Sequence, residues 1–385
     1  MRRDLTMPAS SFRLVLIFLS VGLGAAIAAQ AARYVLVSQY DMFRDGTWYA
    51  TVGDFRAVHL EASYLEHGYL RRGLLGTLLD VFGVVDVALA GWLLSLASVV
   101  VFAGFSGWVA ARLPASRRGV AYMVLPVLVL GPAGIAQFVS DAARVDHVLL
   151  PLAAVAAVAG LRGRLTLSVA LFVVMCLIHE LSIIAFAPVL TVSNILGARD
   201  RTRIRFRHIS FPFSRRSVAA FSFATAAVMA VTLVFGNSPG AVQAFSDAAG
   251  EQPRYSAMIW GENSPVHMVS WLGTASLLLV VYYIALLGLG LSYSMSLRGD
   301  ARLLPAAVLS CLLLNFVGVD GGRWAALSTW TLLVAILAAE LARSEAPDGR
   351  SVGRPFFVFG FILSLPVGPL GVRTPFSLLL RLIEI

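Results

Sequence analysis

Charged residues are scarce in this 385-residue chain, of which 13% is charged and 58% hydrophobic. A soluble domain is typically about 25% charged and about 45–50% apolar, so the composition excludes an ordinary soluble protein. The apolar runs are continuous and roughly twenty residues long, which is the length of a membrane-spanning helix. They lack the alternating segments of about ten residues that a membrane β-barrel would need. The sequence therefore predicts an all-α fold, a polytopic bundle of transmembrane helices.

Lysine is absent, so the net charge of +9 comes from arginine alone. The two cysteines, Cys176 and Cys311, lie inside apolar runs, which indicates neither a disulfide nor a metal site. No carboxylate spacing is typical of metal ligands, and no P-loop or G-x-G-x-x-G pattern is present. We therefore expect no cofactor and no nucleotide donor; a divalent metal ion is not indicated but stays open as an alternative. The basic charge is explained by membrane topology, so we expect no nucleic-acid partner.

About ten or eleven spans fit into one integral membrane domain, 1–385. The first apolar run, 14–37, is too long for the core of a signal peptide, so we expect a retained helix. The run 165–197 is too long for one span, and we interpret it as two helices that meet at "IHEL", because polar residues at mid-bilayer are costly. The expected spans lie near 13–38, 84–112, 119–139, 147–161, 165–179, 181–197, 218–236, 271–293, 303–319, 324–342 and 355–371.

The arginine-rich loops all fall on one face of the bundle if the N-terminus is cytoplasmic, as the positive-inside rule requires. The densest of them is the basic cytoplasmic loop 198–217. The opposite face receives a first external loop at 40–70, an interfacial or re-entrant helix at 70–82 and an external loop at 237–270. These segments, with the short turns "SDAARVDH", "HE" and "VDGGRW", mix acids with arginine, histidine and aromatic residues. They predict a polar cavity that opens away from the cytoplasm.

Two acids directly follow the first span and are the preferred candidates for a general base. Asp41 and Asp45 would be held at the membrane surface, where a water-soluble and a membrane-bound reactant can meet. Most acids of an aqueous loop serve only to keep it solvated, and that alternative stays open for both.

Two adjacent arginines begin the stretch "YLRRGLLGTLLDVFG". Arginine binds phosphate through two parallel hydrogen bonds, and a helix start adds unpaired N–H groups. Arg71 and Arg72, followed by Gly73, therefore predict a phosphate or pyrophosphate clamp. The alternative is that both side chains extend to lipid headgroups.

The segment "SDAARVDHVLLP" places Asp141, Arg144 and Asp146 at a junction between helices. Arg144 can pair with either acid. A structural ion pair and a role in substrate binding are both consistent with this spacing.

A histidine and a glutamate interrupt the apolar segment "CLIHELSIIAFAP". They do not form a zinc motif, because HExxH requires a second histidine where Ile183 stands. We interpret His179 as a donor to a phosphate or sugar hydroxyl and Glu180 as the catalytic carboxylate that orients it. Helix capping is the simpler alternative.

The turn "GVDGGRW" contains two glycines, which allow a tight turn. Asp320 and Arg323 can then face one cavity. Trp324 could stack on a sugar ring, although an interfacial anchor is the commoner role for such a tryptophan.

The acidic first loop, "YLRRGLLG", "ARVDH", "IHE" and "DGGRW" together resemble bacterial multi-spanning proteins of polysaccharide assembly, namely EpsG-like proteins, GT-C-type glycosyltransferases and O-antigen polymerases. The resemblance implies a GT-C-like bundle in the bacterial cytoplasmic (inner) membrane. It implies a polyprenyl-phosphate-linked sugar donor, a glycan or lipid acceptor, and contact with membrane lipids. The general base would be Asp41 or Asp45, with Arg71, Arg72 and Arg323 on the lipid phosphate. The chain departs from many GT-C enzymes because its first loop has no adjacent acid pair and no large soluble domain ends it.

The sequence therefore predicts a glycosyltransferase that transfers or polymerises lipid-linked sugars on the extracytoplasmic face. A transporter or flippase for a lipid-linked or anionic substrate is the alternative. Such proteins tend to show internal repeats and mid-membrane charges, and we find neither. A non-catalytic membrane scaffold would be favoured if the polar clusters were scattered.

Overall fold

The computed structural model describes residues 12–25, 27, 60, 62–67, 69, 73–85, 87–131, 145–206, 209–235, 277–297, 299–311, 321–343 and 352–365. This part of the chain is mostly helical, with one small two-stranded sheet. It begins with a helix at Phe12–Ala25. The further elements are α3 Tyr64–His67, α4 Leu74–Val81, α5 Val87–Arg112, η2 Ala115–Arg117, α6 Arg118–Val129, α8 Asp146–Leu161, α9 Leu165–Ile178, α10 Ser182–Ala185, α11 Ala187–Gly197, β1 Thr202–Phe206, β2 Ile209–Phe213, α12 Arg215–Phe235, α16 Leu277–Ser296, η3 Gly299–Arg302, α17 Leu303–Ala307, α18 Gly321–Arg343 and α19 Arg354–Leu363.

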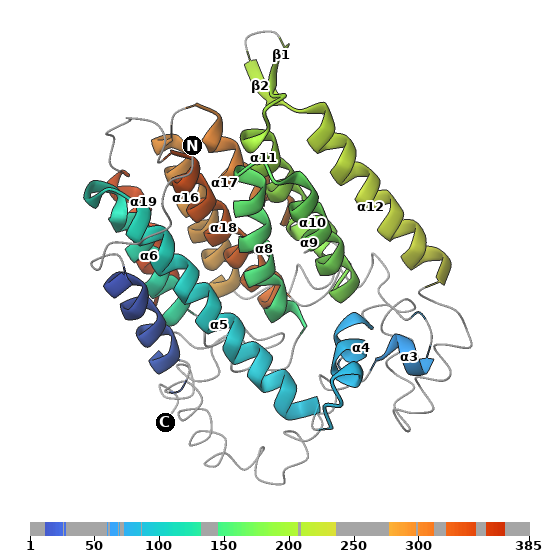
Figure 1. Ribbon diagram of the computed structural model, residues 1–385. Coiled ribbons are helices and arrows are strands. Elements are labelled where there is room, and N and C mark those ends of the chain that lie inside the picture. Colours follow the sequence, from blue (N-terminus) through green and yellow to red (C-terminus); the bar gives the residue numbers. More distant parts are fainter. Residues whose placement is uncertain are drawn as a thin grey trace.

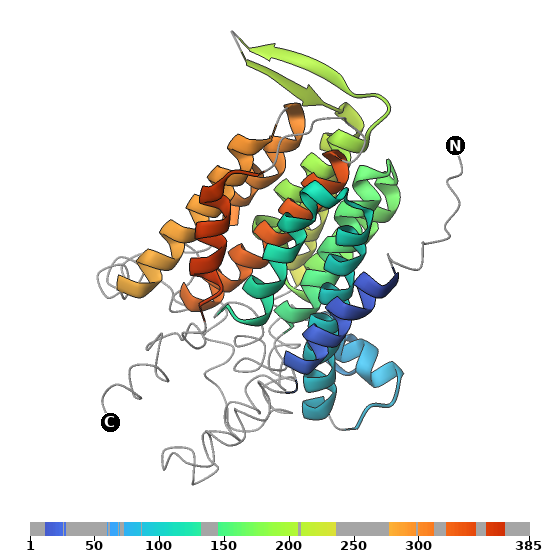
Figure 2. The ribbon, with the colours of Figure 1, turned by 90° about the vertical axis from the view of Figure 1, so that its left-hand side faces the viewer.

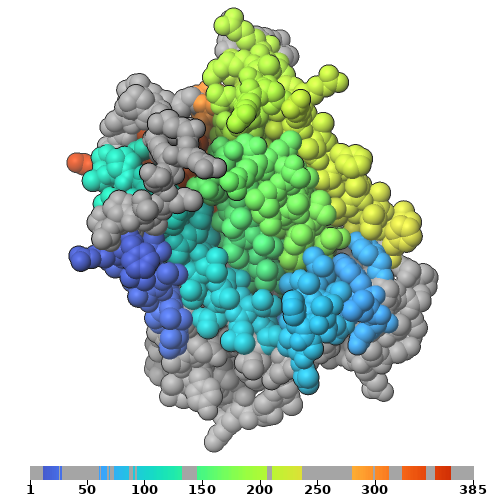
Figure 3. All heavy atoms as spheres, viewed as in Figure 1, coloured from blue at the N-terminus to red at the C-terminus, as the bar shows by residue number. Residues whose placement is uncertain are grey.

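Three of the described helices are long and apolar enough to cross a membrane: Leu93–Arg112, Arg215–Phe235 and Arg323–Arg343. They differ sharply in burial: 89% of the apolar stretch of α18 lies inside the molecule, but only 17% of the apolar stretch of α12 does. Helix α18 is therefore the central helix of the bundle, whereas α12 forms a ridge along one side (Figures 1 and 3). The other apolar helices, judged on their described side chains, have 10–17 residues: Phe12–Ala25, Asp146–Leu161, Leu165–Ile178, Ala187–Gly197, Val280–Ser296 and Arg354–Leu363.

Helix α18 packs against α5, α8, α16 and α17. Apolar side chains provide most of this contact, but a few buried hydrogen bonds join neighbouring helices. Asn194 of α11 donates through Nδ2 to Ser168 Oγ of α9 at 2.7 Å. Tyr282 of α16 meets Thr329 of α18 at 2.9 Å between the two hydroxyl oxygens. Such bonds orient helices whose apolar surfaces alone would allow several arrangements.

The helix break expected at "IHEL" is present. Helix α9 ends at Ile178, and His179 follows in an extended conformation before α10 starts at Ser182. The expected helix at 70–82 is represented by α4, which lies with α3 at one end of the bundle (Figures 1 and 2).

The basic loop 198–217 contains an unexpected β-hairpin, which lies at the opposite end from α3 and α4 (Figures 1 and 2). Its strands are antiparallel, with Arg203 opposite Pro212 and Ile204 opposite Phe211. Arg203 donates two hydrogen bonds to the carboxylate of Asp300 in η3, at 2.9 and 3.1 Å. This ion pair fastens the hairpin to the segment between α16 and α17.

Candidate functional site

Three helix ends bring four polar side chains together. Asp146 is the first residue of α8, His179 and Glu180 follow the last residue of α9, and Arg323 is the third residue of α18. Asp146 lies in a first helical turn, where the helix dipole favours a negative charge. The cluster thus joins segments that are 33 and 177 residues apart in sequence, counted from Asp146 to His179 and to Arg323.

Arg323 is the centre of this cluster. Its Nε donates a hydrogen bond to Asp146 Oδ2, and its Nη2 lies 2.8 Å from His179 Nε2. His179 Nε2 also lies 3.4 Å from Asp146 Oδ1, while His179 Nδ1 lies 3.6 Å from Glu180 Oε2. The side chains of Asp146 and His179 are 3% and 0% exposed, but those of Glu180 and Arg323 are 16% and 17% exposed. The latter two can therefore reach a bound molecule.

Both nitrogens of His179 face a carboxylate, and each tautomer satisfies a different set of contacts. With the proton on Nδ1, the ring points it towards Glu180, and Nε2 accepts from Arg323. With the proton on Nε2, the ring faces Asp146, and Nδ1 accepts from the backbone N–H of Leu181 at 3.2 Å. Arg323 can only donate, so its 2.8 Å contact favours the tautomer in which Nε2 is unprotonated and the proton on Nδ1 faces Glu180. In this arrangement His179 orients the partly exposed carboxylate of Glu180.

The charge balance limits what these side chains do alone. Asp146 and Glu180 carry one negative charge each and Arg323 one positive charge, so the cluster has a net charge of −1 when His179 is neutral. An anionic group would be repelled unless further cations joined it. Binding a phosphate here therefore requires arginines beyond Arg323.

His147, the residue after Asp146, makes buried contacts of its own. His147 Nδ1 is 2.9 Å from Ser95 Oγ of α5, and its ring meets Trp330 of α18 edge to face at 5.6 Å. Both His147 and Trp330 are buried. These residues were missed by sequence reasoning. His147 could have been noticed as the neighbour of Asp146, but Ser95 gives no sequence signal.

Trp324 is 5% exposed, and the guanidinium carbon of Arg323 lies 4.9 Å from the centre of its ring. This contact stabilises the arginine through the negative face of the indole. Stacking on a sugar stays a prediction.

The structure brings together Asp146, His179, Glu180, Arg323 and Trp324 of the residues singled out from the sequence. The other candidates lie outside the described residues: Asp41, Asp45, Arg71, Arg72, Asp141, Arg144 and Asp320. Within the described ranges, no group of three or more His, Cys, Asp or Glu side chains is placed to hold a metal ion.

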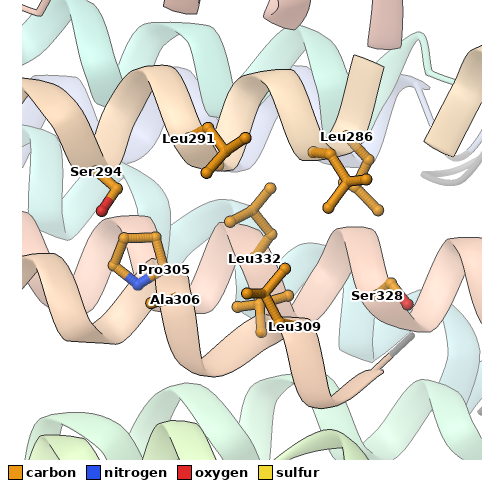
Figure 4. Close-up of a pocket in the computed structure, with 11 residues that line it drawn as sticks. Leu286, Leu291, Ser294, Pro305, Ala306, Leu309, Ser328 and Leu332 are labelled. Carbon is orange, nitrogen blue, oxygen red and sulfur yellow. The ribbon is translucent and has the colours of Figure 1, made fainter. Parts of the chain in front are cut away.

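An apolar groove runs beside α18 between α16 and α17 (Figure 4). It has about 490 Å³ of empty space, part of which is open to the surroundings. Ser294 lies at one end and Ser328 at the other, with leucines between them. Ser328 is buried, and its hydroxyl makes no hydrogen bond to another described residue. It stands five residues after Arg323 on α18, about 7.5 Å along the helix axis.

Comparison of the chain with protein-family models, with curated proteins and with solved structures gives no match.

Proposed function

We propose that this protein is a multi-pass membrane glycosyltransferase that transfers sugar from a polyprenyl-phosphate-linked donor. It would act on the extracytoplasmic face of the bacterial cytoplasmic membrane, with a GT-C-like arrangement of helices. The observation that carries the proposal is the cluster of Asp146, His179, Glu180 and Arg323 at one end of a bundle of apolar helices. Charged side chains among apolar helices are costly and usually functional.

In this proposal, Glu180 removes the proton from an acceptor hydroxyl. It is the more exposed carboxylate of the cluster, at 16% against 3% for Asp146. As the proton reaches Glu180, the hydroxyl oxygen bonds to the anomeric carbon of the sugar. Glu180 is partly exposed and passes the proton to water, so that the carboxylate is restored, while His179 orients it through Nδ1. Asp41 and Asp45 remain alternative bases on the first external loop.

The bond between the anomeric carbon and the phosphate oxygen breaks in the same step, and its electron pair leaves with the lipid phosphate. The phosphate gains one negative charge, which a cation in a water-poor site stabilises more strongly than bulk water does. Arg323 would contribute to this stabilisation. Because Asp146 already compensates the charge of Arg323, Arg71 and Arg72 would supply the further positive charge that the leaving phosphate needs.

The groove beside α18 supports a lipid-linked donor. Its lining is almost wholly apolar, so it can hold a hydrocarbon chain. Ser328, at one end of the groove, is about 7.5 Å from Arg323 along the axis of α18 and about 140° away around it.

A transporter or flippase is the second candidate, and the burial of Asp146 favours it. Networks of acid, histidine and arginine between helices are typical of proton relays in transporters. Movement of a lipid-linked sugar across liposomes without sugar transfer would decide for it.

Purified protein in liposomes, supplied with a polyprenyl-phosphate-linked sugar and a soluble acceptor, provides the test. We expect Glu180→Gln to lower the rate by about 10²–10⁴-fold, the usual contribution of a general base. Arg323→Lys should cause a loss of similar size, because one ammonium cannot replace the planar fork that contacts Asp146 and His179.

Arg203→Ala is the matched control, since it also removes an arginine paired with an aspartate, but at the hairpin, where the side chain is 58% exposed. Wild-type rates in both site variants would reject the proposal.

A further inference from the structure

Two arginines from different helices lie against one tryptophan at the end of the bundle opposite Asp146. The guanidinium carbon of Arg112, the last residue of α5, is 4.3 Å from the centre of the Trp108 ring. That of Arg162, directly after α8, is 5.5 Å from the same ring. Helix α8 itself separates this group from the candidate site, because Asp146 and Arg162 stand 16 residues apart on it, about 24 Å along the axis.

A hydrogen-bonded turn fixes the backbone at Arg162. The N–H of Gly163 donates to the carbonyl oxygen of Gly160 at 2.8 Å, and the N–H of Arg164 donates to that of Ala159 at 2.9 Å. This pair of bonds is a Schellman turn, which ends α8. Gly163 has a φ of +70°, in the left-handed region that favours glycine. The turn thereby sets the direction in which Arg162 leaves the helix. Phe105 stacks on Trp108 with ring centres 5.9 Å apart.

No described acid compensates this pair of charges. Neither Arg112 nor Arg162 forms an ion pair with another described residue, and both side chains are exposed. By contrast, Arg117 and Arg343 share the carboxylate of Glu340. Two guanidinium groups that face one ring repel each other, and an anion between them would remove that repulsion. A phosphate fits because its oxygens accept paired hydrogen bonds from arginine.

The position of Arg112 indicates where the phosphate comes from. Arg112 is the last residue of the candidate span Leu93–Arg112, so it lies at the depth where a bilayer places its headgroups. Tryptophan is enriched at the same depth, and basic residues there attract anionic lipids. We propose that Arg112, Trp108 and Arg162 form a binding site for the phosphate headgroup of an anionic phospholipid. This inference is independent of the proposed function.

Native mass spectrometry of the full-length protein provides the first test. The protein is equilibrated with phosphatidylglycerol or with phosphatidylcholine, and retained lipid is counted. We expect Arg112→Gln/Arg162→Gln to weaken the retention of phosphatidylglycerol at least about tenfold, the effect of losing charge-assisted hydrogen bonds, and to leave phosphatidylcholine unchanged. Arg215→Ala/Arg216→Ala is the control, because it removes two exposed arginines from the start of α12. An equal loss in the control, or no loss in the site variant, would overturn the proposal.

A second measurement needs no variant. Phenylglyoxal modifies accessible arginines, and its sites can be mapped on the wild-type protein in nanodiscs. Phosphatidylglycerol should protect Arg112 and Arg162, but not Arg215, relative to phosphatidylcholine. Protection by millimolar inorganic phosphate alone would identify a soluble phosphate as the ligand and so refute the lipid assignment. Equal modification in all conditions would refute the site.

Discussion

Replacing Glu340 by leucine should destabilise the protein severely, because two buried arginines would lose their counter-ion. Glu340 is 0% exposed, and Arg343 and Arg117 are 6% and 7% exposed. Arg343 Nη1 donates to Glu340 Oε1 at 2.9 Å, and Arg117 Nη1 lies 3.6 Å from Oε2. Tyr293 of α16 donates a third contact to Oε1 at 2.8 Å. The carboxylate therefore holds three elements, η2, α16 and α18, together.

The magnitude follows from these distances. At an effective dielectric constant of ~20, each arginine contact contributes about 5 kcal/mol of attraction, and desolvation of the three charges opposes most of it. Removing only the acid leaves that desolvation uncompensated, which typically costs about 3–5 kcal/mol. We expect the free energy of unfolding of Glu340→Leu to fall by this amount.

Unfolding of the purified protein by denaturant in mixed micelles measures the change. The triple variant Arg117→Met/Glu340→Leu/Arg343→Met should recover most of the lost stability, because no unpaired charge remains. Asp300→Asn is the control for an exposed pair, and it should cost at most about 1 kcal/mol. A loss below about 1 kcal/mol in Glu340→Leu, or a triple variant no more stable than the single one, would refute the reasoning.

Two further substitutions test the packing of helices at other places. Gly76→Ala should detach α4 from the segment before α3, because a Cβ at this position would lie 2.2 Å from the carbonyl oxygen of Ala62. Faster amide exchange in α4 would show the loss of this contact. Gly24→Ala is the control and should leave exchange in α4 unchanged, because a Cβ there would have nothing within 4 Å. Tyr282→Phe should lower the free energy of unfolding by about 1 kcal/mol, because the hydrogen bond to Thr329 is lost. The double variant Tyr282→Phe/Thr329→Val should then be less destabilised than the sum of the two single variants. Strict additivity of the two losses would contradict the contact.

Some of this structure could be read from the sequence because the signal is local. A polar pair inside the apolar run 165–197 predicted a helix break, and α9 ends directly before His179. The hairpin was missed although its signal is also local. In "TRIRF", arginine alternates with apolar residues, which is the period of a strand. The density of arginine in 198–217 favours a loop, whereas the alternation within it is the signal of the strand.

The partners within the candidate site could not be predicted from spacing. The structure pairs Asp146 with Arg323, 177 residues later. The predicted partner Arg144 lies outside the described residues. Spacing along the chain indicates only pairs between near neighbours, because a long-range pair depends on how α8 and α18 pack against each other. The burial of Glu340 was missed for the same reason. In "LAAELARSE" it resembles the solvated end of a helix, and only the positions of η2 and α16 enclose it.

The two ends of α18 use buried charge in different ways. At one end, the carboxylate of Glu340 and both its arginines are at most 7% exposed, so no outside molecule can exchange a proton or a contact with them. At the other end, Arg323 and Glu180 are 17% and 16% exposed, beside the fully buried His179. Exposure of this kind lowers the stabilising effect of an ion pair, because water screens it, but it is required for contact with a substrate. The end that contains Glu340 therefore fastens the helix, and the end that contains Arg323 is the one at which chemistry can occur.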